Sequence, residues 1–198
     1  MPNTLQSPPQ QVQNGVSDDL LITAHAAMLA GRHFNQQASN LAKQGYMGAY
    51  PSSLGQEACQ VAAALALEPA DWLFPTYRDS VAVMSRGIDL TEVLSPFHGS
   101  SHCGYAPTKT HTAPEATPLA THTAHAVGLA MAAKFAGDST VALAMCGDGS
   151  TSEGDFHEAL NLAAVFEAPV VFLVQNNGYA ISTPVSRQMR AASIAAKG

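Results

Sequence analysis

Two short apolar runs separated by a helical stretch constrain the fold of this chain more than any other feature. Residues 140–146 and 170–175 are apolar nearly throughout, as expected for strands of a parallel sheet that is covered on both faces. Between them, residues from about 153 to 166 have helical spacing and follow a glycine-rich turn. The order of strand, helix and strand predicts a βαβ unit and hence the α/β class with a parallel sheet.

The sequence before this unit predicts mostly helix. Ser17 and the acids after it form a polar cap. A short apolar run over residues 72–74 stops at Pro75, and residues 98–118 have the Gly, Pro, Ser, Thr and His content of a long functional loop. Several other segments have helical spacing and are predicted to be helices: about 20–43, 56–67 and 119–136.

Composition excludes several functions. The net charge of −6 has the wrong sign for a nucleic-acid surface. No apolar run approaches the ~20 residues that a membrane-spanning helix needs, so we expect a soluble protein without membrane contact. Only 12% of the residues are charged, about half the usual share, which indicates that another chain covers part of the surface.

The amino-terminal residues and the cysteines bear on localisation. Residues 1–16 are polar and resemble neither a secretory signal nor a transit peptide, so we expect a disordered arm before a domain over 17–198. The 3 cysteines are widely spaced, and the apolar surroundings of Cys59 and Cys146 predict buried thiols. A reducing cytoplasm fits this pattern, with the mitochondrial matrix as the counterpart in a eukaryote.

Polar residues follow each strand of the predicted βαβ unit. Asp148 comes directly after the first strand, and Asn177 follows the second. The two residues are separated by 28 others. One turn, a helix of about four turns, a short loop and one strand consume that length. Because a right-handed crossover brings successive strand ends to one edge, where ligands bind, Asp148 and Asn177 are expected to approach each other.

The residue types at this edge suggest a phosphate and a metal. Gly147 and Gly149 allow close approach of an anion, and the helix that begins nearby directs its amide groups towards it. A carboxylate beside a phosphate requires a cation between them, and oxygen ligands from Asp148 and Asn177 suit Mg²⁺. The backbone carbonyl of Tyr179, in the turn after Asn177, is a candidate for a third ligand.

These motifs resemble a known family. GDG followed by 26 residues and NN is similar to the thiamine diphosphate signature. The segments SEGDFHEALNLAAVF and NNGYAISTP resemble the α subunit of the E1 component of 2-oxo acid dehydrogenases, with the branched-chain enzymes most similar and pyruvate dehydrogenase close. The resemblance, which runs from about residue 20 to the last residue, implies the amino-terminal portion of a three-layer thiamine diphosphate-binding fold with a parallel sheet.

The resemblance assigns site residues one by one. It implies that Asp148, Asn177 and the Tyr179 carbonyl hold Mg²⁺ and that Gly149 and Ser150 contact the diphosphate. The segment FPTYRDS corresponds to the family's YR pair, so Tyr77 and Arg78 are implied as further diphosphate contacts, and a guanidinium fork suits phosphate oxygens. The segment TPLAT resembles the family's SPLAT and places Thr117 and Leu119 against the cofactor.

The resemblance also implies a reaction and partners. Thiamine diphosphate serves in oxidative decarboxylation of a branched-chain 2-oxo acid, and the acyl group passes to a lipoyl-bearing E2 protein. A β subunit supplies the other side of the cofactor site in an α2β2 assembly. The family's catalytic histidine is expected beyond residue 198, so the chain is expected to be truncated at its carboxyl end.

Other interpretations remain open at this stage. The chain could serve a pyruvate or acetoin dehydrogenase, or be a non-catalytic fragment that only binds the cofactor or a partner. Zinc is another possibility, because Cys103 lies among several histidines, but their spacing lacks a paired cysteine motif, so polar filler is favoured. The histidines concerned are His98, His102, His111, His122 and His125.

Overall fold

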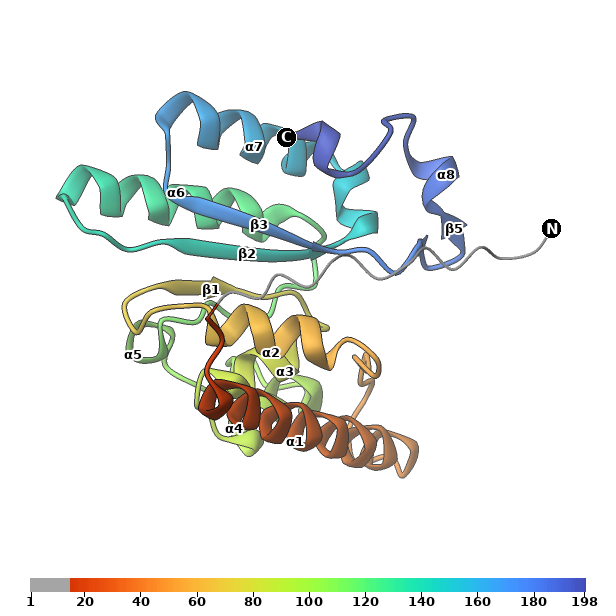
Figure 1. Ribbon diagram of the computed structural model, residues 1–198. Helices are drawn as coiled ribbons and strands as arrows, with labels where there is room; N and C mark the ends of the chain where they lie inside the picture. Colours follow the sequence, from red (N-terminus) through yellow and green to blue (C-terminus); the bar gives the residue numbers. More distant parts are fainter. Residues whose placement is uncertain (1–14) are drawn as a thin grey trace.

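The computed structural model describes residues 15–198 (Figure 1). Residues 1–14, which make up most of the arm predicted over 1–16, lie outside the described part. A 3-stranded parallel sheet in the order β1, β2, β3 lies at the centre of the fold. Its strands are β1 (Trp72–Phe74), β2 (Ala142–Gly147) and β3 (Val170–Gln175).

Helices precede, connect and follow these strands. Before β1 lie α1 (Asp18–Lys43) and α2 (Glu57–Leu65). The connection from β1 to β2 contains α3 (Ser80–Ser85), α4 (Leu90–Leu94), the 3-10 helix η1 (Ser95–His98), α5 (Pro107–Thr110) and α6 (Thr121–Ala136). The 3-10 helix η2 (Asp148–Ser152) and α7 (Gly154–Phe166) connect β2 to β3, which confirms the predicted βαβ unit. After β3 come β4 (Tyr179–Ala180), β5 (Thr183–Pro184), α8 (Val185–Gln188) and the 3-10 helix η3 (Ala195–Lys197).

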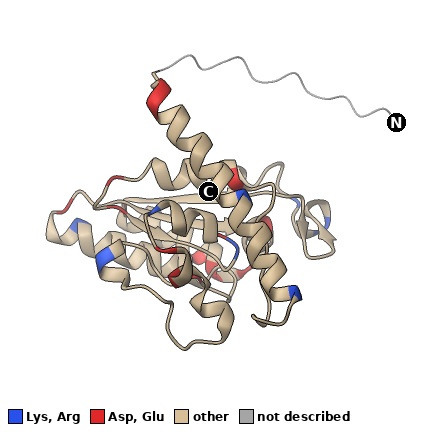
Figure 2. Ribbon diagram, turned by 90° about the horizontal axis from the view of Figure 1, so that it is seen from below, with Lys and Arg blue, Asp and Glu red and all other residues tan. Residues whose placement is uncertain are grey.

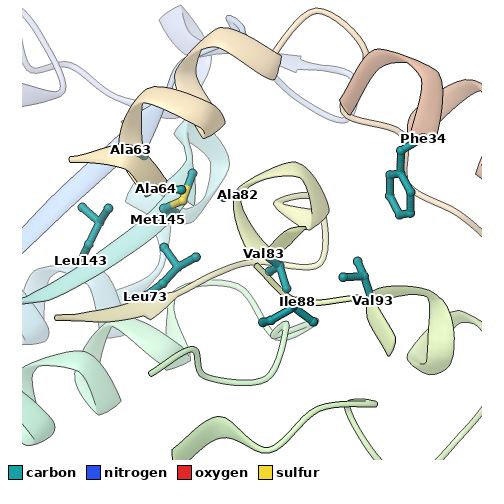
Figure 3. Packing of buried hydrophobic residues seen from close by; sticks show 10 residues of the cluster. All are labelled: Phe34, Ala63, Ala64, Leu73, Ala82, Val83, Ile88, Val93, Leu143 and Met145. Atoms are coloured by element: carbon teal, nitrogen blue, oxygen red, sulfur yellow. The ribbon is translucent and has the colours of Figure 1, made fainter. Parts of the chain in front are cut away.

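The alternation of side chains along the strands sends alternate residues into cores on opposite faces of the sheet. On one face, Leu73, Leu143 and Met145 pack against small residues of α2 and α3, as Figure 3 shows. Alanines of α2 and α3 let these helices approach the strands closely. The helix α1 packs outside them, where it contacts α2 and α3.

The opposite face of the sheet is covered by α6 and α7 (Figure 1). Phe74, Ala142 and Ala144 meet alanines of α6. Further along the strand, Cys146 packs against Phe156 of α7. Helices therefore cover both faces of β2, whose apolar residues are all buried, as the continuous apolar run predicts.

The same expectation is wrong for β3. Val171 is 53% exposed, and the other residues of β3 are only partly buried. The reason is the position of the helices, because the core formed by α2 and α3 is centred on β1 and β2 and reaches β3 only through Leu173. Within the described residues β3 pairs with β2 alone, so its other edge is free.

The helix α1 begins where the sequence predicts. The Ser17 hydroxyl accepts a hydrogen bond from the Leu20 amide at 3.2 Å, as an N-cap should. The first turns of α1 project beyond the rest of the ribbon, and charged residues are sparse over the whole chain (Figure 2). Several apolar side chains on these turns are exposed, among them Leu21 and Ile22.

The cysteines differ from the prediction in one respect. Cys146 is buried, and burial raises the pKa of its thiol to about 12. Cys59, predicted to be buried, is exposed, because it lies on the side of α2 that faces away from the sheet. Within residues 15–198 no helix combines the length and the apolar character that crossing a membrane requires.

The contact between α1 and α3 yields a test of the packing. A Cβ at Gly31 would lie 2.7 Å from Cγ1 of Val81, which is fully buried. We expect Gly31→Ala to lower the free energy of unfolding by about 1 kcal/mol or more, since overpacking outweighs the gain in helix propensity. Urea unfolding measures this change.

Gly128→Ala in α6 is the matched control. A Cβ there meets no atom within 4 Å, so the same substitution should stabilise the chain by up to about 1 kcal/mol. Equal effects of the two substitutions would contradict the packing described for Gly31.

Candidate functional site

A cavity of about 910 Å³ lies at the carboxyl ends of β2 and β3. The register of the two strands pairs Gly147 with Gln175, so both strands end at the same edge and the polar residues after them face one space. The structure brings every site residue predicted from the sequence to the lining of this cavity: Tyr77, Arg78, Thr117, Leu119, Asp148, Gly149, Ser150, Asn177 and Tyr179.

Asp148 begins η2, directly after β2, and its side chain is buried. Within the described residues its carboxylate accepts one side-chain hydrogen bond, from Nε2 of Gln188 at 3.0 Å. A buried carboxylate with one amide donor retains most of its capacity to accept hydrogen bonds or to bind a cation. The environment of Asp148 is therefore suited to a positively charged ligand.

The residues after Asp148 form a close contact with the β4–β5 hairpin. A Cβ at Gly149 would lie 2.9 Å from the Cβ of Ala180, so only glycine lets the hairpin approach η2 this closely. The next residue, Ser150, is buried, and its hydroxyl has no hydrogen-bond partner within the described residues. A cavity-lining hydroxyl without a partner can donate to a ligand oxygen.

Asn177 and Tyr179 belong to the turn between β3 and β4. The Asn177 side-chain oxygen accepts a hydrogen bond from the Tyr179 amide at 3.0 Å, which orients both residues in the turn. Gly178 between them has a φ of 88°, a conformation that favours glycine. The hairpin tip carries Ile181, which is fully exposed and has a φ of 57°, a strained conformation for a β-branched residue.

Tyr77 and Arg78 lie in the turn after β1, which a buried carboxyl group organises. Asp79 accepts hydrogen bonds from the backbone amide and hydroxyl of Thr76 at 2.8 and 2.7 Å, and from Nε2 of Gln175 at 2.6 Å. Burial raises the pKa of Asp79, while these hydrogen bonds act in the opposite direction. Asp79 thus joins the turn that carries Arg78 to the end of β3.

The guanidinium of Arg78 is also positioned by the backbone. Its Nη1 donates to the Ser52 carbonyl at 2.7 Å, and the Arg78 carbonyl accepts from Nε2 of Gln60 at 3.1 Å. Arg78 is the one lysine or arginine among the described residues that line the cavity. Guanidinium has five N–H donors, so the contact with Ser52 leaves others for an anion.

Thr117 and Leu119 are brought to the cavity by pairing between two loops. The Tyr77 amide donates to the Ala116 carbonyl at 3.0 Å, and the Ala116 amide donates to the Pro75 carbonyl at 3.3 Å. Leu119 is 40% exposed, so its side chain is available to a ligand rather than confined to the core. The loop predicted over 98–118 therefore contributes its carboxyl-terminal end to the site.

Sequence reasoning missed several residues of the cavity. Gln175 could have been found, because it ends β3 and the same strand-end argument that selects Asn177 applies to it. Ser52 gives no such signal, since its carbonyl reaches the site only through the loop before α2. The full set of missed lining residues is Ser52, Leu54, Gln56, Thr76, Gln175, Ala180 and Ile181.

The histidines do not form a metal centre in the described part of the chain, where no cluster of at least 3 His, Cys, Asp or Glu side chains could hold an ion. His122, in the first turn of α6, is buried and contacts the Met145 carbonyl through Nε2 at 2.6 Å. Burial lowers the pKa of His122. This histidine is a hydrogen-bonded core residue.

A further, partly buried acid lies beside the paired loops. The carboxyl group of Glu115 accepts a hydrogen bond from the Ser80 hydroxyl at 2.8 Å, and its other oxygen has no partner among the described residues. Burial and, to a smaller extent, the charge of nearby Asp79 raise the pKa of Glu115 to about 8, despite the Ser80 hydrogen bond. Glu115 is therefore mostly protonated at neutral pH.

The chain was also compared with known proteins. Residues 25–198 match the family model described as the dehydrogenase E1 component. The 3-methyl-2-oxobutanoate dehydrogenase subunit alpha of Mycobacterium tuberculosis is 47% identical over 180 residues, which cover 91% of this chain and 49% of that protein. The pyruvate dehydrogenase E1 component subunit alpha of Staphylococcus aureus is 36% identical over 182 residues, which cover 92% of this chain and 49% of that protein. The chain spans about half the length of these curated relatives.

The raised pKa of Glu115 predicts a pH-dependent stability. Because the folded chain holds the Glu115 proton more tightly than the unfolded chain, whose pKa is near 4.5, stability should fall as the pH rises from about 5 to 8 and level off above. Glu115→Gln should reduce this fall by about 4 kcal/mol, as measured by urea unfolding at pH 5, 7 and 9.

Glu158→Gln on α7 is the control, because Glu158 is exposed and its removal should leave the pH profile unchanged. A wild-type profile in Glu115→Gln would show that the Glu115 carboxyl is not buried in its neutral form.

Proposed function

The chain belongs to the dehydrogenase E1 component family, and from this membership we propose that it binds thiamine diphosphate and Mg²⁺ as part of the α subunit of a 2-oxo acid dehydrogenase. The observation that carries the proposal is the cavity at the carboxyl ends of β2 and β3, where residues from distant parts of the chain meet. Ligands of open α/β sheets bind at this edge. The implied architecture is the three-layer thiamine diphosphate-binding fold, and the helices on both faces of the parallel sheet are consistent with it.

The groups in the cavity fit a magnesium-bound diphosphate. Asp148 offers a buried carboxylate, Asn177 an amide oxygen and Tyr179 a backbone carbonyl, which together are oxygen ligands of the kind that Mg²⁺ prefers. The unpartnered hydroxyl of Ser150 and the cavity-lining backbone of Gly149 suit the approach of phosphate oxygens. In this proposal Asp148, Asn177 and Tyr179 hold the metal.

The remaining residues would contact other parts of the cofactor. Arg78 and Tyr77 lie in the turn after β1, where a guanidinium can donate paired hydrogen bonds to the diphosphate. Thr117 and the partly exposed Leu119 face the same cavity from the paired loop and would contact the thiamine moiety. The bound cofactor would supply an electron sink for decarboxylation of a 2-oxo acid.

For the substrate we propose a branched-chain 2-oxo acid. The higher identity to the 3-methyl-2-oxobutanoate dehydrogenase subunit, 47% against 36% for the pyruvate dehydrogenase subunit, supports this choice over pyruvate. The acyl group would pass to a lipoyl-bearing E2 protein. Kinetics with both 2-oxo acids in the reconstituted complex distinguish the two substrates.

We propose a β subunit as the partner, in an α2β2 assembly. Apolar side chains that a monomer would bury are exposed on α7 and β3, including Val165 at 67% and Val171 at 53%. The family's catalytic histidine would have to come from outside residues 1–198, so these residues alone should show no decarboxylation. The free thiols agree with a cytoplasmic location.

Calorimetry tests the metal-binding role. In the reconstituted complex with the β subunit, Asp148→Ala should weaken binding of thiamine diphosphate in the presence of Mg²⁺ by at least about 100-fold, because even outer-shell partners of a metal contribute 10- to 100-fold. Asp138→Ala removes an exposed aspartate at the end of α6 and is the matched control. Equal affinities of Asp148→Ala and wild type would reject the proposed site.

A further inference from the structure

The two turns that carry the proposed metal ligands are connected by more than the βαβ unit. After the turn at Asn177, the chain forms the β4–β5 hairpin and then α8. The Val185 amide at the start of α8 donates to the Gly178 carbonyl at 3.0 Å, which fixes α8 to this turn. The last residue of α8 is Gln188, whose side chain reaches back to Asp148.

Both donors of the Gln188 amide are directed at fixed acceptors. Nε2 donates to Oδ2 of Asp148 at 3.0 Å and to the Thr183 carbonyl at 2.9 Å. The amide oxygen of Gln188 is buried and has no partner in the described part of the chain. An unpaired buried acceptor is unfavourable.

This unfavourable orientation has an electrostatic explanation. Rotating the amide by half a turn would place its oxygen against the carboxylate of Asp148 and the carbonyl of Thr183, both of which are acceptors. The negative charge of Asp148 therefore selects the orientation of Gln188. In return, the donated hydrogen bond restrains the rotation of the Asp148 carboxylate.

A second contact attaches the same segment to η2. Nζ of Lys197 donates to the Thr151 carbonyl at 2.6 Å, and Lys197 lies at the end of η3. The chain after α8 thus contacts the 3-10 helix that Asp148 begins, beside α7 (Figure 1). Gln188 and Lys197 therefore both contact residues of η2, and neither lines the cavity.

We propose that Gln188 is the positioning residue that couples the two metal-binding turns. It holds the Asp148 carboxylate through Oδ2 and so presents the other oxygen at a constant position relative to Asn177, to which α8 is tied through the hairpin. The inference rests on the proposed function, because it assumes that Asp148 binds Mg²⁺. It assigns Gln188 no contact with the substrate.

The test separates metal binding from cofactor binding and from folding. In the reconstituted complex, Gln188→Met should raise the Mg²⁺ concentration needed for half-saturation by about 10-fold at a fixed thiamine diphosphate concentration, the usual effect of losing a residue that orients a metal ligand. At saturating Mg²⁺ the affinity for thiamine diphosphate should return to the wild-type value. The unfolding temperature in EDTA should shift no more than that of the control variant Gln37→Met, because the methionine at position 188 also removes the unpaired amide oxygen.

Two further variants complete the experiment. Gln188→Asn keeps the amide but is one methylene shorter, so it cannot bridge Asp148 and Thr183 and should behave like Gln188→Met. Gln37→Met on the exposed side of α1 makes the same replacement away from the site and should change neither constant.

The outcomes distinguish the inference from the proposed function. An unchanged Mg²⁺ requirement in Gln188→Met overturns the inference, and so does an equal loss of thermal stability, metal affinity and cofactor affinity, which would indicate a structural role alone. If Asp148→Ala also has no effect on Mg²⁺ binding, the proposed function fails as well. A strong effect of Asp148→Ala with none of Gln188→Met leaves the proposed function intact and rejects the role of Gln188.

Discussion

The buried carboxyl group of Asp79 is the interaction on which the candidate site depends. It receives hydrogen bonds from Thr76 in the turn after β1 and from Gln175 at the end of β3, segments far apart in the sequence. The central strand β2 lies between them, so main-chain pairing alone does not join β1 to β3. The hydrogen bond between Gln175 and Asp79 bridges this gap and links the turn that carries Arg78 to the strand that leads to Asn177. Because Asp79 is fully buried, loss of one donor would leave a polar atom unpaired in the core, which favours the observed arrangement.

The centre of the site could be predicted from the sequence because strand ends converge by geometry. The apolar runs of β2 and β3 locate Asp148 and Asn177, and parallel pairing brings them to one edge. Tyr77 and Leu119 required the resemblance to a family, since loops carry no period from which their position follows. Gln188 was not predicted at all, because its role depends on how a short hairpin folds back over η2.

The burial of individual residues was harder to predict than the elements. Apolar composition describes β2 and β3 alike, yet β2 is fully covered and Val171 of β3 is half exposed, because the helices on that face are centred elsewhere. Cys59 lies in an alanine-rich helix and is nevertheless exposed, since only one side of α2 meets the sheet. Local sequence reports how apolar a segment is, whereas the position of neighbouring helices decides which of its side chains are covered.

Under the proposed function, the charges around the cavity favour joint binding of metal and diphosphate over binding of either alone. Arg78 is the one cationic side chain among the described lining residues, and the Asp148 carboxylate lines the same cavity. A diphosphate alone would meet the Asp148 carboxylate with little compensation, and a magnesium ion alone would lack most of its oxygen ligands. Each would therefore improve the proposed site for the other, and by linkage the coupling would be equal in both directions. Asp148 would strengthen this coupling, since a buried carboxylate would repel the free anion and attract its metal complex.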